Sequence, residues 1–126
     1  MKTLKNLLFL TILFCIISTN SFAQKPLLTE EEQVHEAVKT EIDAVLKDKD
    51  FVKQKSKKFA EVSGTMTIDI GVKSNGKVST FFKVEDDIDK PMFTNFVSDY
   101  ILNHKFYFKL PKKQHYKIQY IANFLN

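Results

Sequence analysis

The three histidines are the side chains best suited to bind a metal or to transfer a proton near neutral pH. His35, His104 and His115 lie far apart, without the helical or hairpin spacing that brings two ligands to one metal. A zinc site needs three or four converging ligands. We therefore interpret each histidine as a surface or capping residue, and we expect no metal and no other cofactor.

Acidic residues cluster at two places in the sequence, Glu30–Glu32 and Glu85–Asp89. The second has carboxylates at alternating positions, but it lacks the central glycine and the final glutamate of an EF-hand loop. Glycoside hydrolysis needs one acid in an apolar pocket, whereas both clusters lie at the expected ends of elements. The serines lack the glycine-flanked elbow of hydrolases. We predict no catalytic residues and no enzyme; an unrecognised hydrolase would require a buried acid–base pair.

Composition narrows the range of partners. All 19 basic residues are lysine, and the formal net charge is +4. Guanidinium groups, which bind phosphates and guanine edges through two hydrogen bonds, are absent, so we expect no nucleic-acid partner. The single cysteine, Cys15, lies in the expected leader, which leaves the mature chain without disulfides or thiol chemistry.

Residues 1–23 have the pattern of a secretory signal peptide. Lys2 and Lys5 precede an apolar run, Leu7–Ile17, and a small-residue cleavage site follows between Ala23 and Gln24. The run is shorter than the roughly 20 residues of a transmembrane helix, although an uncleaved anchor is the alternative. We expect an exported protein, periplasmic or secreted, with no stable membrane insertion after cleavage.

Residues 24–58 are expected to form an N-terminal helical segment followed by a basic linker. Thr29 and Glu32 have the spacing of a capping box, and an amphipathic helix is predicted over Glu30–Lys47. Its apolar residues recur at helical spacing: Val34, Ala37, Val38, Ile42, Val45 and Leu46. This stripe is either core or a face for a partner, and core is favoured because a small sheet needs a cover.

The lysine-rich stretch Lys47–Lys58 is interpreted as a solvated linker with a short helix. Phe51, Val52 and Phe59 are the expected anchors that hold it to the body of the protein. A patch for anionic lipid or glycan is the alternative, but charge runs of this kind are usually just solvated.

Residues 59–126 are expected to form a β-β-α-β domain that begins with a hairpin over Gly64–Val84. Apolar residues alternate in both arms, which indicates two half-buried strands. Burial of both apolar faces favours a three-residue loop, Ser74-Asn75-Gly76, with Gly76 in the left-handed conformation after a type I turn. The corresponding pairs are Val72 with Val78, Ile68 with Phe82, and Met66 with Val84.

A second amphipathic helix is predicted over Lys90–Asn103, with Asp87 or Asp89 as its cap and Pro91 in its first turn. Two strands complete the chain: a short aromatic strand, Phe106–Leu110, and a terminal strand, Tyr116–Phe124. The predicted fold class is therefore α+β, with a small antiparallel sheet covered by a helix and preceded by an N-terminal amphipathic helix.

This order of elements resembles the TonB C-terminal domain family over about Phe51–Phe124. The matching features are the run Gly64–Ile70 leading into Asn75–Val78, the helix holding Phe93, Phe96, Val97 and Ile101, the segment Phe106–Phe108 with Pro111, and the final strand Tyr116–Phe124. Phe106 stands where the family usually has tryptophan. The chain would be a stand-alone exported version, without the membrane anchor and proline-rich spacer of the members that transduce energy.

The resemblance implies that the first arm of the hairpin is the central strand of the sheet and that the terminal strand is an edge. Family members use such an edge to add a strand from a partner. The partner-binding residues implied in this way are Tyr116, Ile118, Tyr120, Lys112, Lys113 and Lys117. The lysines would either steer an acidic peptide to the edge or protect the edge from aggregation.

We therefore expect an exported, non-enzymatic protein-binding module of TonB C-terminal-like fold that acts through its terminal strand. The partner would be a protein or peptide segment, for example from an envelope protein, or a second copy of the chain in a homodimer. The alternative is a small secreted inhibitor or enzyme-accessory protein that acts through its loops.

Overall fold

The computed structural model describes residues 24–125, so the predicted leader, including Ala23, lies outside the described part of the chain. Within this range the elements are α2 (Glu31–Lys47), α3 (Lys49–Lys58), β1 (Thr65–Val72), β2 (Val78–Asp86), α4 (Pro91–Leu102) and β3 (Tyr116–Asn123). The fold class is α+β, as predicted. No helix between residues 24 and 125 is long and apolar enough to cross a membrane.

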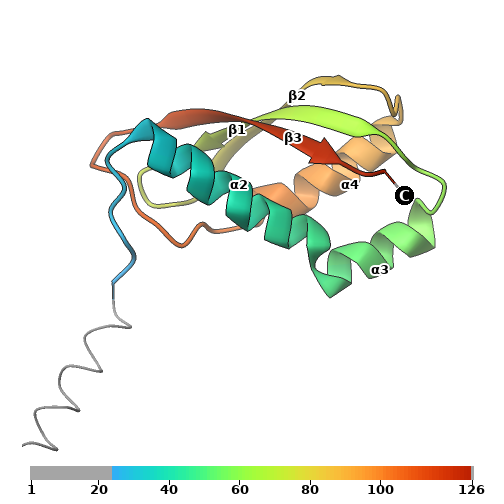
Figure 1. Ribbon diagram of the computed structural model, residues 1–126, viewed down its shortest axis with the longest axis horizontal. Coiled ribbons are helices and arrows are strands. Elements are labelled where there is room, and N and C mark those ends of the chain that lie inside the picture. Colours follow the sequence, from blue (N-terminus) through green and yellow to red (C-terminus); the bar gives the residue numbers. More distant parts are fainter. Residues whose placement is uncertain (1–23, 126) are drawn as a thin grey trace, which may run out of the picture.

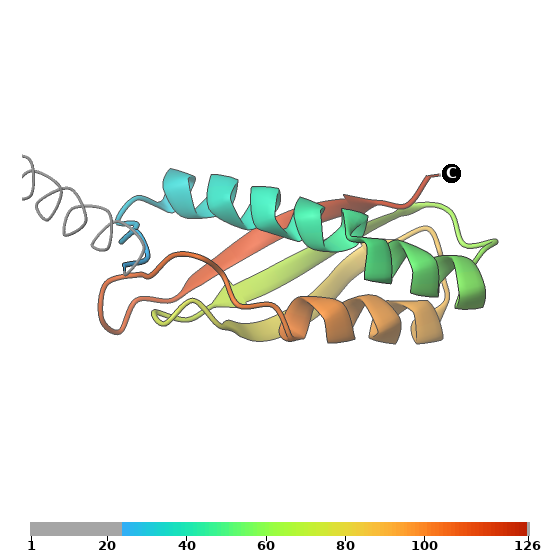
Figure 2. The same cartoon turned by 90° about the horizontal axis from the view of Figure 1, so that it is seen from below.

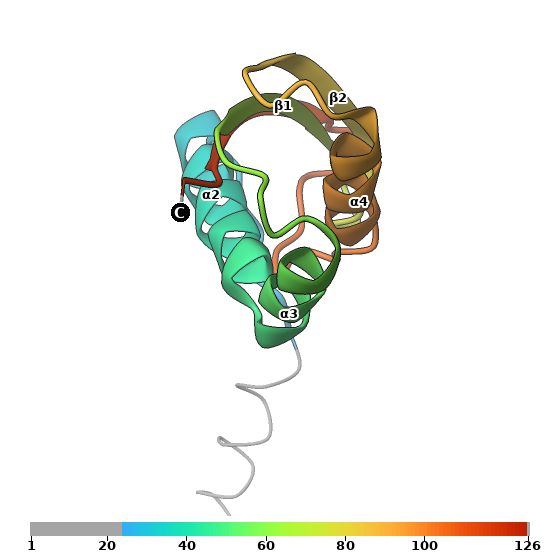
Figure 3. The same ribbon diagram turned by 90° about the vertical axis from the view of Figure 1, so that its right-hand side faces the viewer.

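The three strands form one antiparallel sheet in the order β2-β1-β3, so β1 is central and β3 lies at an edge, as expected (Figure 1). Seen end-on, the sheet arches over the helices, which all lie on its concave side (Figure 3). The helix α2 packs near β3 and α4 packs near β2. Both helices run along the sheet on this same side (Figure 2). The convex side of the sheet carries no other described element.

The core fills the space between the concave face of the sheet and the helices. The predicted stripe of α2 belongs to it, because Val34, Val38 and Ile42 are fully buried. The other large contributions come from alternate residues of β1 and β3 and from α4: Met66, Ile68, Ile70, Val72, Ile118, Tyr120, Ala122, Phe93, Val97 and Ile101. The sequence-based choice of core rather than a partner face for the α2 stripe is therefore confirmed.

The hairpin loop has the predicted length and geometry. Val72 pairs with Val78, and the N–H of Gly76 donates to the Lys73 carbonyl oxygen at 3.0 Å, which closes the turn. Gly76 has φ of +86°, the left-handed conformation that glycine adopts without steric cost. The three-residue loop Ser74-Asn75-Gly76 is therefore confirmed.

Beyond the loop the predicted register is wrong, because each of two bulges inserts one extra residue in β2. The first shift lies between Gly71 and Val72, where a Cβ on Gly71 would lie only 2.3 Å from the Thr80 Oγ1. The second lies between Thr67 and Ile68. As a result Ile68 pairs with Lys83 rather than Phe82, and Met66 pairs with Asp86 rather than Val84.

The first bulge exchanges the two faces of β2, as a one-residue slip must. Phe81 packs against the core, whereas Phe82 is 63% exposed and Val84 is 46% exposed. Phe82 and Val84, which were expected to face the core, therefore belong to the solvent side of the sheet.

The lysine-rich stretch contains the predicted short helix, α3, which is 10 residues long. Phe51 and Phe59 anchor it as predicted, and the Phe51 ring lies 5.1 Å from the rings of both Phe96 and Tyr100. Val52 is 48% exposed, so it is not an anchor. A helix turns by about 100° per residue, and the residue after Phe51 therefore points away from the core.

The segment predicted as an aromatic strand forms no strand of the sheet and makes only isolated bridges. Its Phe106 N–H donates to the Gly76 carbonyl oxygen at 2.8 Å, and its Lys109 N–H donates to the Pro26 carbonyl oxygen at 2.9 Å. The segment is thus held between the hairpin loop and the residues that precede α2. This position buries Phe106 and Phe108 under the sheet.

The helix α2 begins one residue later than the predicted capping box. The Gln33 Oε1 accepts the N–H of Glu30 at 3.3 Å, so the pair Glu30–Gln33 replaces the pair Thr29–Glu32. The three-residue separation of a capping box was predicted correctly, but the box lies one residue further along the chain than predicted.

The helix α4 has Pro91 in its first turn as predicted, but its N-cap is Lys90. Neither Asp87 nor Asp89 caps it. Instead the Asp87 Oδ1 accepts the N–H of Thr65 at 2.8 Å, which satisfies a backbone donor at the start of β1.

Candidate functional site

The outer edge of β3 presents backbone groups that are not used in the sheet. Phe124 N–H donates to the Gly64 carbonyl oxygen at 2.7 Å, which makes these two residues a hydrogen-bonded pair. Bonded and non-bonded pairs alternate along an antiparallel ladder. The N–H and C=O groups that point away from β1 therefore belong to Lys117, Gln119, Ile121 and Asn123. No other described strand pairs with them.

The ladder between β1 and β3 is regular over eight residue pairs, with no bulge. By contrast, β2 has the features that protect an edge from pairing. Two bulges interrupt it, and Lys83 and Asp86 point inward, where they form an ion pair at 3.4 Å. Asp86 Oδ2 is buried without a hydrogen-bond partner among the described residues. Of the two sheet edges, only that of β3 is suited to accept another strand.

A groove runs between the outer edge of β3 and α2. It consists of two adjoining hollows of about 460 and 360 Å³, which share His35 and Gln119 in their walls. We call this feature the β3 groove, and the residues that line it are Glu31, Glu32, His35, Glu36, Lys39, Lys117, Ile118, Gln119, Tyr120 and Ile121. Figure 2 shows α2 following β3 along its length.

A side-chain hydrogen bond holds the two walls of the β3 groove together. The Tyr120 hydroxyl, on β3, donates to the Asp43 carboxylate, on α2. Burial raises the pKa of Tyr120 above its ordinary value, and the hydrogen bond to Asp43 and the negative charge of Asp43 raise it further. Tyr120 is therefore a neutral donor at physiological pH, and its bond fixes the spacing between α2 and β3.

The structure separates the sequence-predicted binding residues into two groups. The side chains of Ile118 and Tyr120 face the core and are 3% and 6% exposed, so they form only the floor of the β3 groove. Their backbone groups are also directed toward β1. Tyr116 is half-buried at the start of the strand.

The predicted lysines are exposed, but they are not all on the edge. Lys117 lies on β3 itself, whereas Lys112 and Lys113 lie in the turn before it, where Lys113 has φ of +65°. Gln24, the expected first mature residue, is exposed at the start of the described range. The lysines thus occupy one end of the strand rather than its whole length.

Sequence reasoning missed Gln119 and Ile121, which carry the outward backbone groups at the centre of the edge. Ile121 is 64% exposed on the convex face of the sheet. The alternation of the terminal strand contained the necessary signal, because residues out of phase with the buried set must face solvent. The sequence-based prediction also missed the glutamates of α2 as a wall of the site, because no local pattern of residues places α2 beside β3.

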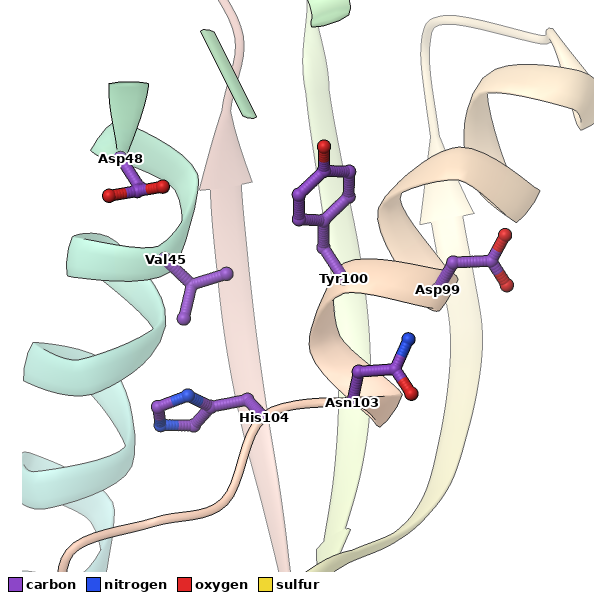
Figure 4. A pocket seen from close by; sticks show the side chains of 6 residues that line it. All are labelled: Val45, Asp48, Asp99, Tyr100, Asn103 and His104. Carbon is purple, nitrogen blue, oxygen red and sulfur yellow. The ribbon is translucent and has the colours of Figure 1, made fainter. Parts of the chain in front are cut away.

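A separate hollow of about 390 Å³ lies between α2 and α4, away from the β3 groove (Figure 4). Its lining residues are Val45, Asp48, Asp99, Tyr100, Asn103 and His104. The Tyr100 hydroxyl donates to Asp50 at 2.6 Å, and mainly this hydrogen bond raises the pKa of Tyr100 to about 12. His104 Nε2 lies 2.9 Å from Glu41 Oε1. In Figure 4 Asp99 and His104 point in opposite directions, so these groups do not converge on a bound molecule.

Among residues 24–125, no group of three or more histidine, cysteine, aspartate or glutamate side chains is placed to hold a metal ion. No family model matches the chain. Neither a curated protein nor a solved structure matches it. The geometry of the β3 groove is therefore the basis for a functional proposal.

Proposed function

We propose that the protein is an exported, non-enzymatic binding module of TonB C-terminal-like fold, which binds an extended segment of a partner protein as an added strand beside β3. The outer edge of β3 carries this proposal, because it is regular over eight residues, has outward backbone groups and is flanked by the β3 groove. The order of the elements around a central β1 supports the family assignment. The predicted leader supports a periplasmic or secreted location.

Strand addition obtains affinity from main-chain hydrogen bonds and selectivity from side-chain contacts. An added segment would bond to the outward N–H and C=O groups of Gln119, Ile121 and their neighbours, and each bond would contribute about 0.5–1.5 kcal/mol. Alternate side chains of the segment would point toward α2 or to the convex face of the sheet. Several such bonds, together with side-chain contacts in the β3 groove, would hold the segment in a reversible complex.

Gln119→Pro is the variant that tests this mechanism. The N–H of Gln119 points away from β1, so proline removes one outward donor and leaves the ladder between β1 and β3 intact. Gln119→Ala keeps the donor and is the matched control. The probe is a library of random nine-residue peptides displayed on phage and selected against the mature chain, followed by fluorescence anisotropy with the synthetic peptides that are recovered.

We expect Gln119→Pro to weaken peptide binding by about ten-fold or more, because one of a few main-chain bonds is lost and the ring blocks close approach. Gln119→Ala should bind as the unmodified protein does. Circular dichroism verifies that both variants are folded. Failure to recover any peptide, or equal binding by the two folded variants, would refute strand addition at β3.

The loop-acting alternative predicts a different pattern of sensitivity. Lys112→Glu combined with Lys113→Glu reverses the charge of the turn before β3 without changing the outward groups of the strand. An inhibitor or accessory protein that acts through this loop would lose its partner in the double variant. An edge binder would keep its peptide, and this comparison separates the two functions.

A further inference from the structure

The β3 groove has an uneven distribution of charge along its length. Glu31, Glu32 and Glu36 line the hollow at the start of β3, where Lys117 is the only lysine in the wall. The adjoining hollow contains Lys39 and no carboxylate in its wall. None of the three glutamates forms an ion pair with a residue in the described range. One end of the groove therefore carries an excess of carboxylates that form no ion pairs with residues 24–125.

The alternation of β3 determines which side of an added strand would meet this charge. The side chain of Ile118 points to the concave side of the sheet, toward α2, and that of Ile121 points to the convex side. In a flat pair of strands, directly opposite residues share a face. A residue placed opposite Ile118 would thus point at the glutamates of α2, and one placed opposite Ile121 would lie against an exposed apolar side chain.

We propose that the segment that binds in the β3 groove carries a lysine or arginine opposite Ile118 and an apolar residue opposite Ile121. The two positions are three residues apart in the segment, whichever way it runs. This inference rests on the proposed function, and it reverses the polarity that the lysines near β3 suggested from sequence, because the groove wall beside the strand is acidic. A basic side chain there would gain one or two charge-assisted hydrogen bonds.

A second copy of this chain does not fit the same position. In its own β3 the residues that would have to face the glutamates are Ile118, Tyr120 and Ala122, which are buried beneath α2. Its single β3 lysine, Lys117, points the other way. Pairing of two β3 strands would also bring two α2 helices to the same concave side of the joined sheet. The occupant is therefore a segment of another protein, and one face of that segment carries basic side chains that no helix covers.

Selection from the random nine-residue library tests the proposed pattern directly. We expect the recovered peptides to share a lysine or arginine and, three residues away, an apolar residue. The affinity of one such peptide is then compared with that of a version in which glutamate replaces the basic residue, by fluorescence anisotropy at low and high salt. The replacement should weaken binding by about ten-fold at low salt and by less at high salt.

Glu36→Lys and Glu85→Lys form a matched pair of protein variants. Both glutamates are exposed and both changes alter the net charge equally, but Glu85 lies on β2, at the opposite edge of the sheet. We expect Glu36→Lys to lose the basic peptide and to favour the glutamate version, while Glu85→Lys retains the original preference. This result would locate the recognition of charge at the α2 wall.

The remaining outcomes overturn the inference in distinguishable ways. Peptides that bind in a manner sensitive to Gln119→Pro, but without a basic preference or with equal effects of Glu36→Lys and Glu85→Lys, would refute the charge pattern and leave strand addition standing. Absence of any peptide sensitive to Gln119→Pro would refute strand addition as well. A dimer in sedimentation equilibrium that peptides dissociate would make a second copy the occupant.

Discussion

Gly76→Ala is expected to destabilise the protein strongly, although the change adds only one methyl group to the hairpin loop. Gly76 has φ of +86°, and an L-residue in this region costs about 1–2 kcal/mol. The new Cβ would also lie 2.6 Å from the Phe108 carbonyl oxygen and 3.0 Å from that of Phe106. These are backbone atoms, so the segment that contains them must move as a unit.

This movement would lengthen or break two hydrogen bonds that join the segment to the hairpin loop. Phe106 N–H donates to the Gly76 carbonyl oxygen at 2.8 Å, and Leu110 N–H donates to the Ser74 carbonyl oxygen at 2.9 Å. Each contributes about 0.5–1.5 kcal/mol. With the backbone strain, the expected loss of unfolding free energy is about 2–5 kcal/mol, a large part of the stability of a small domain.

Urea denaturation of the mature chain, followed by circular dichroism, measures this loss. Gly76→Asn separates the two causes, because asparagine tolerates a positive φ but carries the same Cβ. We expect Gly76→Asn to recover about 1 kcal/mol and to remain destabilised. Asn75→Gly, which adds no Cβ and removes the bond from the Lys77 N–H to the Asn75 Oδ1 at 3.0 Å, is the control and should cost about 1–2 kcal/mol, because glycine also gives the unfolded chain more freedom.

Full recovery of stability in Gly76→Asn would show that only φ matters, and that the carbonyl groups of the neighbouring segment are not a constraint. A loss below about 1 kcal/mol in Gly76→Ala would contradict both parts of the reasoning.

Three further results follow from the packing and the titratable groups. Phe81→Ala should lower the unfolding free energy by about 2 kcal/mol and Phe82→Ala by less than about 0.5 kcal/mol, because the bulge turns only Phe81 to the core; equal urea midpoints would refute the observed register. Phe51→Ala should cost about 3–5 kcal/mol in the same assay, since its ring is buried against two others, and a small effect would mean that α3 is only loosely attached. The raised pKa of Tyr120 adds stability that is complete below the unfolded value near 10.0 and is lost as pH rises above it. Urea unfolding from pH 8 to pH 12 should therefore show a steeper alkaline loss for the unmodified protein than for Tyr120→Phe, and parallel curves would contradict a native bond to Asp43.

For α2, β1, α4 and β3, periodicity was enough to predict where each element lies and which face it buries. The spacing of apolar residues identified α2, β1, α4 and β3, because amphipathic patterns reflect contact with a core wherever that core is. The loop at Gly76 was predictable for the same reason, since both its conformation and its length follow from local residues.

Errors arose where a distant contact overrode the local pattern. The register of β2 depends on bulges that form against Gly71 and Thr67 of the neighbouring strand, and the alternation of β2 alone does not contain them. The aromatic segment after α4 forms its hydrogen bonds with the hairpin loop and with Pro26, far away in sequence, rather than with the sheet. In the same way, Asp87 bonds to Thr65 instead of capping the nearby helix.

The candidate site shows the same division. Sequence alone determined that the chain ends in an alternating strand with a buried set and an exposed set of side chains, because alternation is a property of the strand itself. The resemblance implied that this strand lies at an edge, but only the tertiary structure decided that the β2 edge is blocked and what lies beside β3. Bulges and inward-pointing charged side chains hinder the addition of a strand to β2. The packing of α2 along β3 leaves the outer edge of β3 accessible and places glutamates beside it. These features depend on where elements distant in sequence meet, and no local pattern of residues specifies that.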